Sequence, residues 1–224
     1  MSQPDFKTLT GDESNFPYDS WEQVYQQSAL HELPWDAPEA HPLLIEIFKD
    51  HRPKPGTRAL DLGCGTGASS RLLANVGYEV DALDVSETAI MRARVLSKGG
   101  GCSTRYIVGN AIKYALNSTS VYGLVLDCLF LHHVQEDDID AYFNSVRNTL
   151  CVGGLYVVGV FVQVDDTIKR ASYFSDGEVR YWTQSGIEQY LGACFVCDSA
   201  FYGLAGSVDH NYPAGFFMFT KQRE

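Results

Sequence analysis

The sequence predicts an α/β protein: a doubly wound, mostly parallel sheet of seven strands with one antiparallel hairpin strand at an edge. Two observations predict this fold class. From residue 58 onward, short and almost continuously apolar runs alternate with amphipathic segments, which is typical of parallel strands covered by helices on both faces. The last two apolar runs are joined by a loop containing glycine and proline, which favours an antiparallel hairpin.

The individual elements follow from apolar periodicity and from capping and turn residues. Helices are expected at 18–33, 42–48, 68–76, 86–97, 137–150 and 183–191. Strands are expected at 58–62, 78–83, 104–108, 121–127, 155–162, 195–202 and 216–220. The chain is thereby divided into an N-terminal helical segment, residues 1–56, which we expect to act as a cap, and a cofactor-binding domain, residues 57–224.

Length and composition fit one globular domain with an N-terminal extension, because 224 residues with 45% hydrophobic and 20% charged content can form one full core. No apolar run reaches the ~18 residues of a membrane span, and the polar start lacks a signal-peptide core. The six cysteines lie scattered, mostly in apolar runs, so we expect a cytoplasmic protein with reduced thiols and no metal site. A net charge of −11 without a basic cluster argues against a nucleic-acid partner.

The strongest motif is a glycine-rich turn after the first predicted strand. An apolar run ends in an acidic residue, three glycines alternate with other residues, and an amphipathic helix follows. Glycines let the backbone take positive φ and let a ligand approach the main chain, while the helix start offers free N–H groups. We therefore expect a cofactor to contact Asp61, Gly63, Cys64, Gly65 and Gly67.

The turn alone leaves the cofactor open, because Gly63, Gly65 and Ala68 also satisfy the dinucleotide fingerprint with alanine in third place. Residues that follow the other strands supply further candidates, since ligands of open α/β sheets lie outside the carboxyl ends of the strands. Asp84 follows the second strand, 21 residues after Gly63, and its carboxylate can accept hydrogen bonds from both hydroxyls of a ribose.

Together these motifs resemble the class I methyltransferases that depend on S-adenosylmethionine (SAM), over roughly residues 57 to 220. Asp61 and the glycines match the family's Asp-x-Gly-x-Gly-x-Gly motif, and Asp84-Val85-Ser86 looks like its acidic loop. The resemblance implies a Rossmann-like fold, with SAM as cofactor and S-adenosylhomocysteine as product. It also implies that Val85 lies against the adenine ring.

Two later segments extend the resemblance. Gly109-Asn110-Ala111 stands where the family carries Gly-Asp-Ala. The resemblance therefore implies that the Asn110 oxygen accepts the adenine amino group and that Ala111 lies beside the cofactor. After the fourth strand, it implies that Asp127 and Cys128 flank the methionine end of SAM.

His132 and His133 are the candidate catalytic residues. They follow the fourth strand, on the side where the resemblance places the donor methyl group. Imidazole titrates near neutrality, so either side chain can act as a general base for an oxygen or nitrogen acceptor, or can position the acceptor. A thiolate acceptor needs little more than alignment with the donor.

The N-terminal segment, with Trp21 and Leu33-Pro34-Trp35-Asp36, also looks like the thiol, halide, thiopurine and tellurite methyltransferase branch, in which such a segment folds over the cofactor. Trp35 is accordingly expected at the cofactor, where its ring can face the sulfonium. The combined interpretation is methyl transfer from SAM to a small molecule by a monomer or homodimer, without membrane or nucleic-acid partners. An NAD(P)-dependent oxidoreductase, a non-catalytic SAM-binding partner subunit and a protein methyltransferase remain alternatives.

Overall fold

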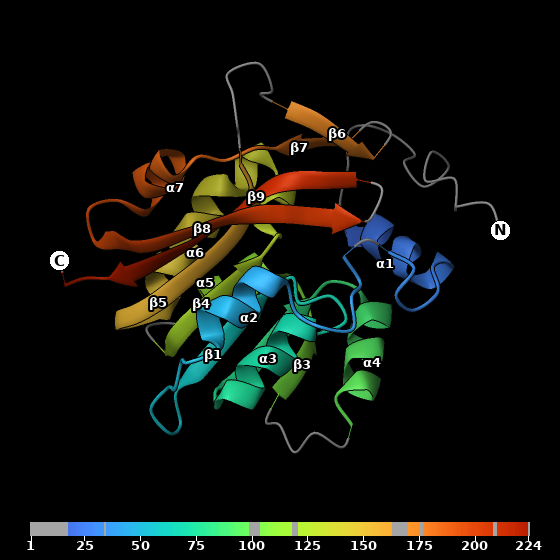
Figure 1. The fold of residues 1–224 in the computed structure, drawn as a ribbon, viewed down its shortest axis with the longest axis horizontal. Helices are drawn as coiled ribbons and strands as arrows, with labels where there is room; N and C mark the ends of the chain where they lie inside the picture. Colours follow the sequence, from blue (N-terminus) through green and yellow to red (C-terminus); the bar gives the residue numbers. More distant parts are fainter. Residues whose placement is uncertain are drawn as a thin grey trace.

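A seven-stranded sheet forms the centre of the protein, and the structure, a computed structural model, describes residues 18–33, 35–98, 104–117, 121–162, 170–174, 177–207 and 210–223. The strands follow the order β3-β2-β1-β4-β5-β9-β8 across the sheet (Figure 1). Their bounds are β1 Arg58–Leu62, β2 Glu79–Asp84, β3 Thr104–Val108, β4 Tyr122–Cys128, β5 Leu150–Phe161, β8 Phe195–Ser207 and β9 His210–Lys221.

Strand direction confirms the predicted sheet. Strands β1 to β5 run parallel to their neighbours, whereas β9 runs antiparallel to both β5 and β8. β9 is therefore the reversed strand of this sheet, and it forms with β8 the hairpin that the sequence predicts. The hairpin is longer than predicted, because pairing continues from Phe195 and Lys221 to Ser207 and His210.

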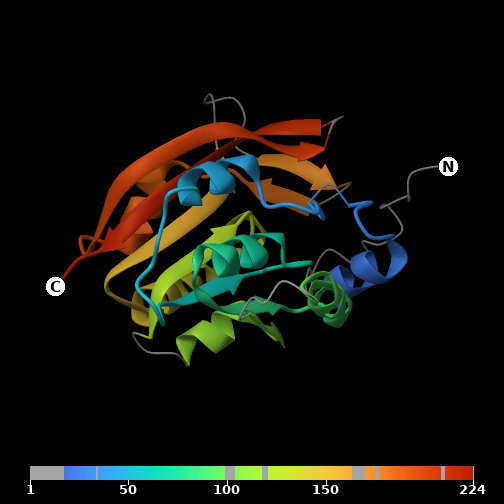
Figure 2. The same ribbon diagram turned by 60° about the horizontal axis from the view of Figure 1, so that its bottom comes forward.

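Helices cover both faces of the sheet, as Figures 1 and 2 show. One face carries α2 Pro42–Phe48, α3 Ala68–Val76 and α4 Glu87–Leu96; the other carries α5 Ala111–Leu116, α6 Ile139–Thr149 and α7 Gln184–Leu191. Side chains of β1 alternate between the two cores: Ala59 packs with the first group of helices, and Leu60 and Leu62 pack with the second. No helix within the described ranges is long and apolar enough to cross a membrane.

The N-terminal helices lie on two different parts of this framework. α1 Tyr18–Gln27 packs against α4, and α2 packs against α3 and β8 (Figure 1). The His41 ring begins α2, because its Nδ1 accepts the Leu43 N–H at 3.2 Å while its Nε2 donates to the Leu204 carbonyl at 3.0 Å. The division into residues 1–56 and 57–224 stays a prediction, and residues 1–17 of the expected cap lie outside the described residues.

Several element boundaries differ from the prediction. α1 ends at Gln27, whereas the sequence pattern predicts a helix that continues to residue 33. β5 begins at Leu150, because it already pairs there with Tyr122 of β4 across a bulge. Between β5 and α7, where the sequence predicts no element, the structure has a small antiparallel sheet of β6 Arg170–Phe174 and β7 Gly177–Arg180, and residues 163–169 and 175–176 lie outside the described ranges.

Helix α5 is absent from the sequence prediction. It has six residues, too few for apolar periodicity to be recognised. Asn110 begins it, since the side-chain oxygen accepts the Lys113 N–H at 2.9 Å, as asparagine commonly does at a helix start.

A close approach between β5 and β9 generates a stability prediction. A Cβ atom at Gly159 would lie 2.3 Å from Cε1 of Phe216, its fully buried cross-strand partner. We predict that Gly159→Ala lowers the free energy of unfolding by about 1–3 kcal/mol, measured by urea denaturation, because the ring has no space to move into. Gly109→Ala is the matched control, with no atom within 4 Å of its Cβ, and should change it by less than about 0.5 kcal/mol. Equal stabilities of the two variants would contradict the prediction.

Candidate functional site

The turn between β1 and α3 has three glycines in the left-handed region of the backbone. Their φ angles are 68° at Gly63, 52° at Gly65 and 81° at Gly67. The turn is also closely packed: a Cβ at Gly63 would lie 2.6 Å from the Phe130 ring, and a Cβ at Gly65 would lie 2.8 Å from Tyr25 Oη. Glycine is therefore needed at these positions both for conformation and for space.

Asp84 at the end of β2 holds this turn. Its Oδ2 accepts the Gly65 N–H at 2.9 Å, and its Oδ1 accepts the Ser86 N–H at 2.9 Å. Burial raises the pKa of Asp84, although the two backbone N–H groups partly oppose the shift. Because each carboxylate oxygen has two lone pairs, both can accept a further hydrogen bond from a ligand. Val85 follows, half-buried.

Asp61 and Cys64 lie beneath the turn. Asp61 is 1% exposed and accepts a hydrogen bond from the Ser70 hydroxyl. Burial, with a smaller contribution from the charge of Asp84, raises the pKa of Asp61 to about 7. Burial also raises the pKa of the Cys64 thiol well above its usual range, so this thiol is neutral and unreactive. A cationic group beside Asp61 would favour the ionised carboxylate.

The loop after β3 lies next to Asp84. The Gly109 N–H donates to the Asp84 carbonyl at 2.8 Å, which joins the ends of β2 and β3. The side-chain oxygen of Asn110 accepts the Lys113 N–H at the start of α5. Ala111 is buried at the first position of that helix.

The loop after β4 is organised by Asp127. This side chain is 0% exposed and accepts hydrogen bonds from the N–H groups of Phe130 and Leu131 and from the hydroxyl of Tyr142. Burial raises its pKa to about 7, against the lowering effect of these three donors. Asp127 thus points into the protein and shapes the loop. Burial likewise raises the pKa of the neighbouring Cys128 thiol to about 12, so this thiol is neutral.

The two histidines form part of a row of aromatic rings. The His132 ring is 5% exposed, stacks 4.4 Å from Phe161 and lies 4.1 Å from the ring of His133. Burial lowers the pKa of both rings, to about 4 for His133. His132 Nδ1 has no hydrogen-bond partner in the described part of the chain. His133 in turn lies edge-on to Trp21 of α1, with 4.8 Å between ring centroids.

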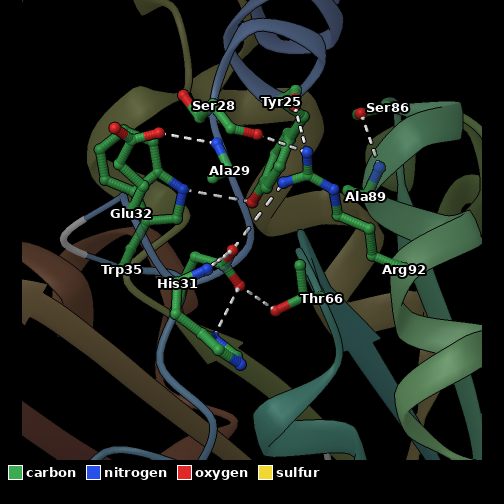
Figure 3. Close-up of polar contacts among 11 residues, drawn as sticks. Tyr25, Ser28, Ala29, His31, Glu32, Trp35, Thr66, Ser86, Ala89 and Arg92 are labelled. Atoms are coloured by element: carbon green, nitrogen blue, oxygen red, sulfur yellow. Dashed lines mark hydrogen bonds and ion pairs between the residues drawn. The ribbon is translucent and has the colours of Figure 1, made fainter. Parts of the chain in front are cut away.

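The N-terminal segment covers the glycine turn. Tyr25 is buried with its hydroxyl against Gly65, and the Trp35 indole N–H donates to this hydroxyl at 3.2 Å (Figure 3). Trp21 lies edge-on to Trp35, with 5.6 Å between ring centroids. The structure therefore brings Trp35 together with the turn. Trp21 contacts both Trp35 and His133, and His133 contacts His132, so the histidines are connected to Trp35 through Trp21 in this row of rings.

Residues 59–154 match the sequence profile of a family described as methyltransferase domain. A ubiquinone biosynthesis O-methyltransferase of Sinorhizobium fredii is 31% identical over 144 residues, which make up 63% of this chain and 56% of that protein. The chain thus spans little more than half the length of this relative.

Solved structures share the fold. A structure described as "Conversion of a Disulfide Bond into a Thioacetal Group during Echinomycin Biosynthesis" has a TM-score of 0.72 at 20% identity, covering 92% of this chain and 93% of its own. The 1,6-didemethyltoxoflavin-N1-methyltransferase of Burkholderia thailandensis, solved with 1,6-didemethyltoxoflavin and S-adenosylhomocysteine, has a TM-score of 0.67 at 19% identity, covering 92% and 84%. The match of residues 59–154 and these shared folds support a class I SAM-dependent methyltransferase.

Four loops of the protein meet at one end of the sheet, after β1, β2, β3 and β4. They contain the predicted site residues outside the N-terminal segment, although Asp61 and Asp127 point into the protein rather than out of it. Among the residues that the structure describes, no group of three or more His, Cys, Asp or Glu side chains is arranged to hold a metal ion.

The polar contacts of α1 with this site could not be predicted from the sequence. The Glu22 carboxylate accepts hydrogen bonds from the Ser86 hydroxyl at 2.6 Å and from the Thr88 hydroxyl and N–H at 2.6 and 3.1 Å. Burial raises the pKa of Glu22, but these donors outweigh it and the net shift is downward. Glu22 and Tyr25 were visible in the sequence only as members of a helix, because no local motif marks contacts across more than 40 residues.

The buried carboxyl group of Asp127 predicts a pH effect on stability. Its pKa is about 7 in the folded protein and close to the ordinary ~3.9 in the unfolded chain, so the folded state binds the proton more tightly. Its contribution to stability is therefore full below about pH 4 and is lost as the pH rises through about 7. Asp127→Asn keeps the shape of the side chain but cannot ionise, so the variant does not lose stability in this way as the pH rises. The free energy of unfolding of the variant relative to wild type should increase from about pH 5 to about pH 8 in urea titrations.

Asp140→Asn removes an exposed carboxylate of α6 and is the matched control, for which we expect a much weaker trend. A stability difference between Asp127→Asn and wild type that stays constant with pH would show that the carboxyl group does not titrate in this range.

Proposed function

We propose that this protein is a SAM-dependent methyltransferase that transfers the methyl group to a small-molecule acceptor. The observation that carries the proposal is Asp84, whose two oxygens hold the glycine turn and the following loop while keeping lone pairs for a ribose diol. The match of residues 59–154 to a methyltransferase domain family supports SAM as the nucleoside that supplies this diol.

The remaining loops fit the other parts of SAM. Asn110 follows β3 next to Asp84, where we place the adenine amino group, and half-buried Val85 supplies an apolar surface for the ring. Asp61, whose pKa is about 7, can ionise in response to the ammonium group of the methionine end. Gly63 and Gly65 permit the positive φ of the turn, and a side chain at either position would collide with Phe130 or Tyr25.

When bound, SAM supplies a methyl group already activated on a sulfonium. The protein then has to align the acceptor with this group and to exclude water. Trp21, Tyr25 and Trp35 of the N-terminal segment supply the apolar cover over the turn. We place the sulfonium near the Trp35 ring, where a cation–π contact would stabilise it.

We further propose that the acceptor atom is a hydroxyl oxygen, in line with the O-methyltransferase name of the Sinorhizobium relative. The imidazole of His133, with a pKa of about 4, is neutral at physiological pH and can accept a hydrogen bond from that hydroxyl. The same low pKa makes it a weak base. His133 therefore orients the acceptor and directs its lone pair, and removal of the proton depends mainly on the acidity of the acceptor itself.

The cofactor prediction is tested by titration calorimetry with SAM and S-adenosylhomocysteine. Asp84→Ala should weaken binding about 10- to 100-fold, since a charge-assisted hydrogen bond contributes roughly 1.5–3 kcal/mol. Glu79→Ala, an exposed carboxylate at the other end of β2, is the matched control and should bind like wild type. Binding of NAD(P) instead of SAM would identify an oxidoreductase and refute the proposal.

The reaction is tested by screening phenols, thiols and amines for S-adenosylhomocysteine formation, with peptides as a comparison set. We expect turnover with hydroxyl acceptors. SAM binding without turnover of any small molecule would point to a non-catalytic SAM-binding subunit, and turnover of peptides alone would point to a protein methyltransferase.

The function of His133 is tested by the pH dependence of turnover in wild type and by the effect of His133→Ala. His133→Ala should reduce turnover at least about 10-fold with SAM affinity unchanged, because the acceptor loses its hydrogen bond. In wild type, protonation of His133 should not lower the rate until the pH falls towards 4, where the imidazolium can no longer accept a hydrogen bond. His51→Gln alters a histidine that contacts Tyr78 before β2 and should leave turnover unchanged. A rate that falls below a pKa near 6.5 and is abolished in His133→Ala would instead identify a general base.

A further inference from the structure

A buried carboxylate connects the N-terminal segment to the glycine turn. Asp36 is 2% exposed, and its Oδ1 accepts a hydrogen bond from the Thr66 hydroxyl at 2.5 Å. Its Oδ2 accepts the His31 N–H at 2.9 Å, and the Arg92 guanidinium lies 4.0 Å away. Thr66, His31 and Arg92, which are labelled in Figure 3, come from three separate parts of the chain and all approach Asp36. Donors and positive charge on several sides compensate the cost of burying this carboxylate.

Arg92 belongs to the same arrangement. From α4 it donates through Nη2 to the Tyr25 carbonyl at 2.7 Å and to the Ser28 carbonyl at 2.5 Å (Figure 3). Its Nη1, which has no hydrogen-bond partner in the described ranges, is the atom nearest Asp36. One guanidinium therefore binds the end of α1 and also faces the carboxylate.

Thr66 is held a second time through its main chain. Arg71 of α3 donates through Nη1 to the Thr66 carbonyl at 2.7 Å and through Nη2 to the Pro38 carbonyl at 2.9 Å. The Thr66 side chain thus binds Asp36 directly, and its carbonyl is connected to Pro38 through Arg71. Its two neighbours, Gly65 and Gly67, have positive φ angles. Contacts at Thr66 therefore add to the Gly65–Asp84 hydrogen bond in fixing the shape of the turn.

We propose that Asp36 is a positioning residue for cofactor binding: acting through Thr66, it holds the glycine turn in its binding conformation, so that SAM affinity depends on attachment of the N-terminal segment. This inference rests on the proposed function. Asp36 does not have to contact the cofactor itself. It binds Thr66, and the adjacent residue Gly65 donates its N–H to the Asp84 carboxylate.

The geometry selects the variant that tests the proposal. Asp36→Asn keeps volume and shape, but three donors converge on this group, and an amide NH₂ would have to face one of them. Thr66→Val removes the hydroxyl from the other side of the contact, and Thr66→Ser retains it. Glu39→Gln removes an exposed carboxylate of the same segment and is the matched control.

Titration calorimetry with SAM and S-adenosylhomocysteine should give about 10- to 100-fold weaker binding for Asp36→Asn and for Thr66→Val. The double variant should bind no more weakly than the weaker single variant, because both remove one contact. Thr66→Ser and Glu39→Gln should bind like wild type. In turnover assays the KM for SAM should rise by the same factor while kcat changes little, an effect that a purely stabilising contact would not produce.

Two results would overturn the inference while leaving the proposed function intact: folded Asp36→Asn that binds SAM within about threefold of wild type, or single effects that multiply in the double variant. If Asp36→Asn fails to fold, Thr66→Val against Thr66→Ser decides the question, and equal SAM affinity of these two refutes the inference. Wild-type protein that binds neither SAM nor S-adenosylhomocysteine would overturn the proposed function and this inference together.

Discussion

The hydrogen bond from the Gly65 N–H to the Asp84 carboxylate is the interaction on which the rest of the site depends. It links the ends of two neighbouring parallel strands, and a backbone with positive φ at Gly65 is needed to direct the N–H towards β2. The main chain of Asp84 extends the connection, since its carbonyl accepts the Gly109 N–H from the loop after β3. Three loops are thereby joined around one residue. The backbone donors at Asp84 also offset part of the cost of burying its charge.

The second constraint is that α1 attaches to these loops by polar contacts as well as by apolar packing. Glu22 binds the start of α4, Tyr25 lies against Gly65, and Asp36 binds Thr66. The Glu22 contact ends at the start of α4, and the other two end on the glycine turn, the last of them from a residue that follows α1. A segment attached in this way adds little core of its own, but it determines how much water reaches the glycine turn and how near an acceptor can come to it.

The sheet could be predicted because parallel strands buried on both faces leave apolar runs in the sequence, and the glycine turn could be predicted because its backbone admits few other residues. The contacts of Asp36 could not, since a carboxylate 30 residues before its partner has no periodicity to mark it. Asp127 illustrates another limit: an acidic residue after a strand has the same appearance whether it faces a ligand or accepts hydrogen bonds from the next turn. The weak basicity of His133 arises from burial by distant segments, which motif spacing does not record.

The contacts of residues 36–38 have a consequence for how such proteins diverge. Asp36 and Pro38 lie before the region 59–154 shared with the methyltransferase domain family, whereas Thr66, Arg71 and Arg92 lie within it. Substitutions on the two sides of this boundary are therefore expected to covary among close relatives. An N-terminal segment transplanted from another family member would bring the wrong partners for these three side chains, so the segment is inherited together with the turn that it contacts.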